Sequence, residues 1–233
     1  GEAITGGAFA WAPDSRRIAW ITVNGFAVVN VANGQRIGGC AEYFQYPNEL
    51  RWSPTEDVLA VAHTSEGQLG IWGVGEVEAF GRRLARGYWH SGWARCVAWH
   101  PDGERGVTGG DDGMLVWWKW EDEDVHRESN MAVGAPITAV HISTAGEVFA
   151  AGKDGRIVVV RVERHAEELL APQGTFGDET PTSFVVSPDT RWLVRARGGE
   201  VLAMRTVAGA SQLVVGEYPG TIQALAVSPD GLR

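Results

Sequence analysis

One short element recurs six times along the chain, and this repetition constrains the fold more than any other feature. Each copy is an apolar residue followed by Ser-Pro-Asp or a variant of it, and the copies begin at Trp11, Trp52, Trp99, Ile142, Val186 and Val227. Successive copies are separated by 41, 47, 43, 44 and 41 residues. Self-similarity at a period of this size indicates an architecture in which one supersecondary unit is repeated.

Each repeat has the pattern of short strands joined by tight turns. Pro presets φ and Gly supplies a positive φ, so the recurring element predicts a turn after a buried strand. A second apolar run follows, as in Val58–His63, and then a second turn ending in Gly, as at Asp112 and Gly113. A third run, as in Met114–Lys119, and a weaker fourth, as in Gln212–Val215, complete the unit. Four antiparallel strands in about 43 residues match the size of one β-propeller blade.

We therefore predict an all-β protein, a β-propeller of four-stranded antiparallel blades, with about five full blades plus the first strand of a sixth. Residues 1–233 form a single propeller region in this interpretation. The approximate blades are residues 1–40, 41–87, 88–130, 131–175 and 176–217, and the next blade starts within 218–233. A seven-bladed ring needs roughly 280–315 residues. Because open rings leave bare blade faces, we expect another chain or a missing segment to complete this one.

The third repeat carries the most specific motifs. It reads His90-Ser-Gly-Trp-Ala-Arg-Cys-Val-Ala-Trp-His-Pro-Asp-Gly, then Thr108-Gly-Gly-Asp-Asp-Gly, and then Trp118-Lys. His90 lies 11 residues before Pro101, Asp112 lies 11 residues after it, and Trp118 follows Asp112 by 6. With these offsets the chain resembles the WD-repeat family. The resemblance is divergent, since Lys119 stands where the family has Asp and the other repeats keep fewer motif residues.

The resemblance implies a buried structural hydrogen-bond network of His90, Thr108, Asp112 and Trp118. A buried carboxylate needs donors, which imidazole and hydroxyl groups can supply. Trp adds an indole N–H and a large packing surface. A similar mixture of side chains occurs in catalytic sites, but the resemblance assigns these four to the blade interior. We therefore expect no catalytic residues and a protein that is not an enzyme.

Charge and cysteine content narrow the choice of partners and cofactors. The net charge of −9 argues against nucleic acid as the main partner, because phosphate-binding surfaces cluster Lys and Arg. Cys40 and Cys96 match no metal-ligand spacing, so we expect no metal and no cofactor. No apolar run approaches the ~18 residues of a membrane span, and no signal peptide is recognisable at Gly1. These features favour a cytoplasmic protein that does not bind a membrane.

Aromatic residues in the connections between repeats are the candidate partner-binding residues, and they are Tyr43, Tyr46, Trp89, Trp93 and Tyr218. In a propeller these connections lie on one face around the central channel, where exposed aromatic side chains anchor partners. Packing between blades is the alternative role for the same residues.

Two charged runs offer further contact sites. The first contains Arg82, Arg83 and Arg86, and would bind phosphate or an acidic partner; the second is the acidic run 121–124. Both runs are also typical of solvated strands and loops.

The combined features predict a non-catalytic platform that binds a protein or peptide, as the sensing, scaffolding or regulatory module of a larger multidomain protein. The alternative is a propeller enzyme or small-ligand binder that uses the central channel. The platform is favoured because no nucleophile motif or phosphate-binding glycine motif is present.

Overall fold

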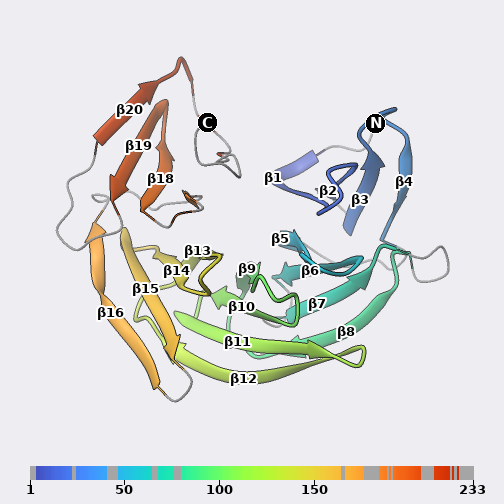
Figure 1. Ribbon diagram of the computed structural model, residues 1–233, viewed down its shortest axis with the longest axis horizontal. Helices are drawn as coiled ribbons and strands as arrows, with labels where there is room; N and C mark the ends of the chain where they lie inside the picture. The colour runs from blue at the N-terminus through green and yellow to red at the C-terminus, as the bar shows by residue number, and fades with distance from the viewer. Residues whose placement is uncertain are drawn as a thin grey trace.

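The computed structural model describes residues 4–22, 25–40, 47–64, 68–75, 80–163, 166–175, 184–187, 189, 191–205, 213–220, 222 and 225. Within these ranges twenty strands form five four-stranded antiparallel sheets, and there is no helix. The sheets follow one another around an arc as the blades of a propeller (Figure 1). The predicted all-β propeller fold is therefore confirmed. The recurring element at Val227 lies outside the described residues.

Each blade consists of four strands that are consecutive in the sequence. Blade 1 contains β1 (Ile4–Trp11), β2 (Arg17–Thr22), β3 (Gly25–Asn30) and β4 (Arg36–Gly39). Blade 2 contains β5 (Pro47–Trp52), β6 (Val58–His63), β7 (Gln68–Gly73) and β8 (Arg83–Tyr88). Blade 3 contains β9 (Ala94–Trp99), β10 (Arg105–Gly110), β11 (Met114–Glu121) and β12 (Asp124–Ala132). Blade 4 contains β13 (Ile137–Ile142), β14 (Val148–Gly152), β15 (Arg156–Glu163) and β16 (Ala166–Thr175). Blade 5 contains β17 (Phe184–Val186), β18 (Trp192–Arg197), β19 (Glu200–Arg205) and β20 (Leu213–Glu217).

The first strand of each blade lies innermost and the fourth lies at the outer edge (Figure 1). Each first strand contacts the first strand of the next blade, from β1 through β5, β9 and β13 to β17. A connection between blades therefore runs from the outer edge of one blade to the inner strand of the next. The β8–β9 connection is the one that carries His90.

The apolar core lies between neighbouring blades. Phe26 of blade 1 packs edge-on against Trp72 of blade 2, with ring centroids 5.8 Å apart. All six residues of β6 and all six of β7 are buried, because each of these strands has a neighbouring blade on both faces. This arrangement explains why the central strands are continuous apolar runs without strict alternation.

The apolar residue that ends the first strand of a blade packs against the preceding blade. Trp52, Trp99, Ile142 and Val186 occupy this position in blades 2 to 5, and all four are buried. The Trp99 indole donates to the carbonyl of Arg51 in blade 2 at 3.2 Å. Trp11, at the same position in blade 1, is 50% exposed. The burial of this position therefore comes from the preceding blade.

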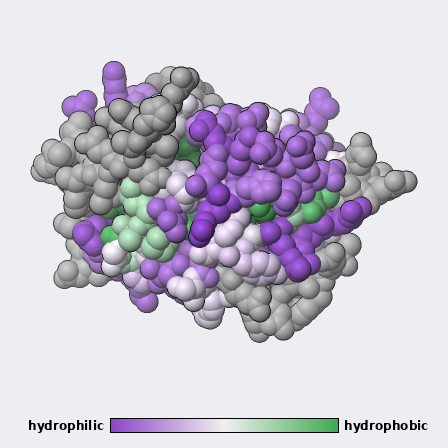
Figure 2. Space-filling view, turned by 90° about the horizontal axis from the view of Figure 1, so that it is seen from below, coloured by the Kyte–Doolittle hydropathy of each residue, from purple (hydrophilic) through white to green (hydrophobic). Residues whose placement is uncertain are grey.

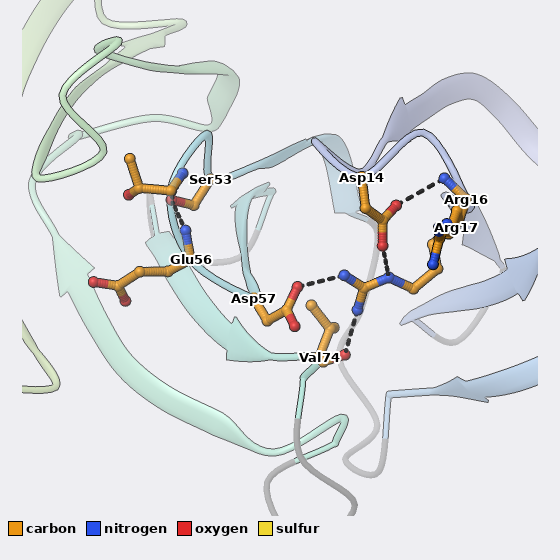
Figure 3. A network of polar contacts seen from close by, with 8 residues as sticks. Asp14, Arg16, Arg17, Ser53, Glu56, Asp57 and Val74 are labelled. Carbon is orange, nitrogen blue, oxygen red and sulfur yellow. Dashed lines mark hydrogen bonds and ion pairs between the residues drawn. The ribbon is translucent and has the colours of Figure 1, made fainter.

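Blades 1 and 2 are also joined by a polar cluster around Arg17 (Figure 3). Its guanidinium binds Asp14 of its own blade at 2.8 Å and Asp57 of blade 2 at 2.5 Å. The same group lies 4.9 Å from the centroid of the Trp52 ring and donates to the Val74 carbonyl at 3.4 Å. One side chain thus combines ion pairing, cation–π contact and packing at the blade interface.

Candidate functional site

The structure brings three of the four expected network residues together in blade 3. His90 Nδ1 lies 3.0 Å from Asp112 Oδ1, and His90 Nε2 lies 2.9 Å from Thr108 Oγ1. A neutral imidazole that donates from Nδ1 to the carboxylate can accept the Thr108 hydroxyl hydrogen at Nε2. The His90 side chain is 1% exposed, so this arrangement satisfies both of its nitrogens without water.

Asp112 connects the network to the backbone on both sides. It accepts hydrogen bonds from the amides of Ser91 at 3.0 Å and Met114 at 3.1 Å. Ser91 belongs to the β8–β9 connection and Met114 begins β11, so one carboxylate holds the connection against the β10–β11 turn. A Cβ at Gly110 would lie 2.5 Å from His90 Nδ1, so the imidazole needs glycine at this position.

Trp118 differs from the expectation. Its indole nitrogen is buried and has no hydrogen-bond partner in the described part of the chain. The fully buried ring packs edge-on against Trp99, with centroids 4.8 Å apart and an interplanar angle of 79°. It also covers Gly106, where a Cβ would lie only 2.2 Å from the ring. In this structure Trp118 contributes packing and no hydrogen bond.

Trp93 is the exposed aromatic residue of the β8–β9 connection. Its side chain is 48% exposed, whereas Trp89 is half-buried, with its ring covering Gly87 and packing against the core between blades 2 and 3. Tyr218 follows β20 and is exposed beside the β18–β19 turn. Tyr43 and Tyr46 lie outside the described residues. Among the candidate aromatic residues, Trp93 combines exposure with a position next to the network.

The Trp93 ring is held by its neighbours. The Arg95 guanidinium lies 4.4 Å from the ring centroid. Arg95 is itself fixed by Asp111, with Nε to Oδ1 and Nη2 to Oδ2 both at 2.8 Å. The Asp111 amide donates to the Trp93 carbonyl at 3.0 Å. These contacts restrict the rotamers of an exposed indole and its cation.

Our reading of the sequence missed Arg95 and Asp111. A signal was present for Arg95, because residues two apart on an extended chain project to the same side, which places Arg95 beside Trp93. The role of Asp111 depends on the pairing of β9 with β10, which brings Gly110 opposite Ala94.

A family model described as "WD domain, G-beta repeat" matches residues 82–119, the segment that contains the His90 network. The chain is also 26% identical over 147 residues to "WD repeat-containing protein 75" of Danio rerio. The matched stretch covers 60% of this chain and 17% of the zebrafish protein. Both findings agree with the five-bladed architecture. The chain is a β-propeller that is similar to WD-repeat proteins.

The basic run of the propeller lies at the outer edge of blade 2. Arg82 and Arg86 are exposed, and the Arg86 guanidinium lies 5.5 Å from the centroid of Tyr88. Arg83 is partly buried, 5.6 Å from the centroid of the Trp72 ring. The acidic run forms the exposed tip of the β11–β12 hairpin, where Asp122 and Glu123 have positive φ angles.

A metal site and a reactive thiol each have requirements that can be compared with the propeller's described residues. No group of three His, Cys, Asp or Glu side chains in these ranges could hold a metal ion. Burial raises the pKa of the Cys96 thiol well above its ordinary value. Such a thiol is a poor nucleophile. Within the described ranges there is also no apolar helix of membrane-spanning length.

The buried His63 and the half-buried His141 resist protonation. Burial, and secondarily the charge of Arg83, lowers the pKa of His63 to about 3. Burial, and secondarily Arg51, lowers the pKa of His141 to about 4. Because histidine in an unfolded chain titrates near pH 6.5, the unfolded state binds these protons first as the pH falls. Both histidines therefore contribute stability that is complete above about pH 6.5 and decreases as the pH falls toward their folded pKa values.

We expect the His63→Gln variant to have a weaker pH dependence of stability than the wild type. Between its folded and unfolded pKa values, each such histidine lowers the free energy of unfolding by about 1.4 kcal/mol for each unit by which the pH falls. Glutamine does not titrate, so the variant lacks this contribution. Urea unfolding between about pH 6.5 and pH 4 measures this slope. An unchanged slope would mean that His63 binds its proton equally well in both states.

Proposed function

We propose that the propeller is a rigid platform that binds a protein partner on the face carrying Trp93. The proposal rests on one observation: an exposed indole that is held in place by Arg95, which is itself paired with Asp111. WD-repeat propellers are generally non-catalytic modules that bind proteins, and the similarity to them favours an interaction or scaffold role.

The geometry around Trp93 suits a binding hot spot. Tryptophan and arginine are enriched at hot spots because they cover a large area and combine apolar and polar contacts. Ordering side chains on binding costs free energy, and this cost is reduced when the free protein already restricts their rotamers. Trp93 and Arg95 meet this condition. The Trp93 ring contacts Arg95 of β9, and Arg95 is paired with Asp111 in the turn after β10.

The zebrafish relative supports a module role for the propeller. The matched stretch is a small part of that longer WD-repeat protein. We extend the proposal accordingly: the platform acts as a scaffolding or regulatory module within a multidomain protein.

We expect Trp93→Ala to weaken partner binding by about 2 kcal/mol, or roughly thirtyfold, because a hot-spot side chain is lost. The measurement compares, by quantitative mass spectrometry, the proteins retained on immobilised wild type and variant. Trp192→Ala is the matched control, since Trp192 is also exposed, with Arg205 5.6 Å from its ring centroid, but lies in blade 5. Equal retention by a folded Trp93→Ala variant would place the binding site elsewhere.

A further inference from the structure

A cavity of about 270 Å³ lies between blades 3 and 4, away from Trp93. β9 begins just after Trp93 and ends just before His100, which lines the cavity, so the two sites lie at opposite ends of this strand. The outer edge nearby is formed by β12, and much of the described surface on that side is hydrophilic (Figure 2). The cavity is lined by His100, Arg105, Gly106, Trp117, Glu128, Ser129, Ile142, Ala145, Gly146 and Val148.

Glu128 reaches this cavity from a β-bulge in the outer strand. Trp117 pairs with Ser129 and Trp118 pairs with Arg127, so Glu128 is the extra residue. A bulge redirects the side chain of the unpaired residue.

The same bulge occurs in other blades with a different kind of residue. The registers of blades 1, 2 and 5 leave Ile37, Leu84 and Val215 as the unpaired residues. All three are apolar, so the bulge itself does not require an acidic side chain. Of these four blades, only blade 3, which borders the cavity, has a carboxylate at this position.

The cations that line the cavity are not paired with Glu128. Arg105 donates through Nε to Asp102 at 2.8 Å, and His100 Nδ1 lies 2.9 Å from the same carboxylate. Partial burial opposes ionisation of Asp102, but hydrogen bonds from Arg105 and nearby amides hold its pKa below the ordinary value. Asp102 therefore neutralises Arg105. In the described part of the chain Glu128 forms no direct ion pair: the ammonium of Lys119 contacts Glu121, and Glu128 acts on Lys119 only as a more distant charge.

Part of the remaining wall is apolar. Trp117, Ile142 and Val148 are buried residues that present carbon surface to the cavity. A basic side chain combines an aliphatic stem that packs on such surface with a cationic head that favours a carboxylate and an aromatic face. The protein's net charge of −9 also favours approach of a cationic segment.

We propose that this cavity binds a lysine or arginine side chain of a protein partner. Glu128 pairs with the cationic head, and Trp117, Ile142 and Val148 pack against the aliphatic stem. The site shares no residue with the Trp93 face, so each of the two proposals can fail without the other.

The test is a titration of the isotope-labelled protein followed by NMR, with n-butylammonium and n-butylguanidinium as probes. We expect saturable shifts at the amides of Glu128, Ser129 and Gly146. Glu128→Gln removes the counter-charge at an exposed position and should weaken binding about threefold or more. The matched control is Glu217→Gln, which removes the same charge from exposed β20 and should leave the affinity unchanged.

Butyrate serves as the anionic probe. If butyrate produces these shifts and the cations do not, the cavity is an anion site formed by Arg105 and His100, and the proposal is wrong. Equal cation affinity in wild type and Glu128→Gln would also overturn it, as would the absence of shifts at the cavity with every probe.

Discussion

Replacement of Trp118 by alanine is expected to lower the free energy of unfolding by about 3–5 kcal/mol, the largest effect among the substitutions considered. The ring is fully buried, covers Gly106 and packs edge-on against Trp99. Its removal leaves a cavity between blades 2 and 3 that neighbouring strands can fill only in part. Urea or thermal unfolding of the purified variant measures the change.

Two further variants serve as controls: one separates packing from hydrogen bonding at position 118, and the other removes an exposed tryptophan elsewhere. Because the Trp118 indole nitrogen has no hydrogen-bond partner among the described residues, Trp118→Phe should recover much of the loss through restored apolar contact. Trp192→Ala, at an exposed position, should cost less than about 1 kcal/mol. If Trp118→Phe were as destabilising as Trp118→Ala, the indole N–H would have to contribute a hydrogen bond that the structure does not contain.

Asp112→Ala is expected to destabilise the propeller by about 1–3 kcal/mol. The carboxylate accepts hydrogen bonds from His90 and from the amides of Ser91 and Met114. Without it, the imidazole of His90, which is 1% exposed, loses the partner of Nδ1 in a site that water does not reach. The change in unfolding midpoint in urea gives the magnitude.

The neighbouring acid provides a matched control for this prediction. Asp111 pairs with Arg95 near the surface, and exposed ion pairs contribute at most about 1 kcal/mol. Asp111→Ala should therefore be clearly less destabilising than Asp112→Ala. Equal effects of the two substitutions would show that the His90 network does not hold the β8–β9 connection in place.

The fold was predictable because its determinants are local and repeated. The turn residues in each copy of the recurring element, together with the spacing between copies, identify the blade. Packing between blades does not change the order of strands and turns within a blade. The offsets that link His90, Thr108 and Asp112 are likewise fixed by strand and turn lengths in one blade. The exposure of Trp11 was not predictable from the motif, since burial of this position depends on a preceding blade.

The finer features of the sites depend on pairing that the sequence does not display. The role of Glu128 follows from a one-residue shift in register between β11 and β12 and from the walls supplied by blade 4. The packing of Trp118 without a hydrogen bond depends on the relative orientation of two rings. Such features arise from contacts between strands, where a shift of one residue changes the face of every side chain.

Site-specific photo-crosslinking tests the central claim most directly. A photoreactive phenylalanine derivative replaces Trp93 in one variant and Val31 in another, and both proteins are irradiated in the cells that make them. Val31 is a suitable control because it is exposed in the β3–β4 turn, at the opposite end of the strands. We predict crosslinks to a defined protein partner from position 93 and none to that partner from position 31. Equal crosslinking from both positions, or crosslinks to the partner from position 31 alone, would contradict the assignment of the Trp93 face as the docking surface.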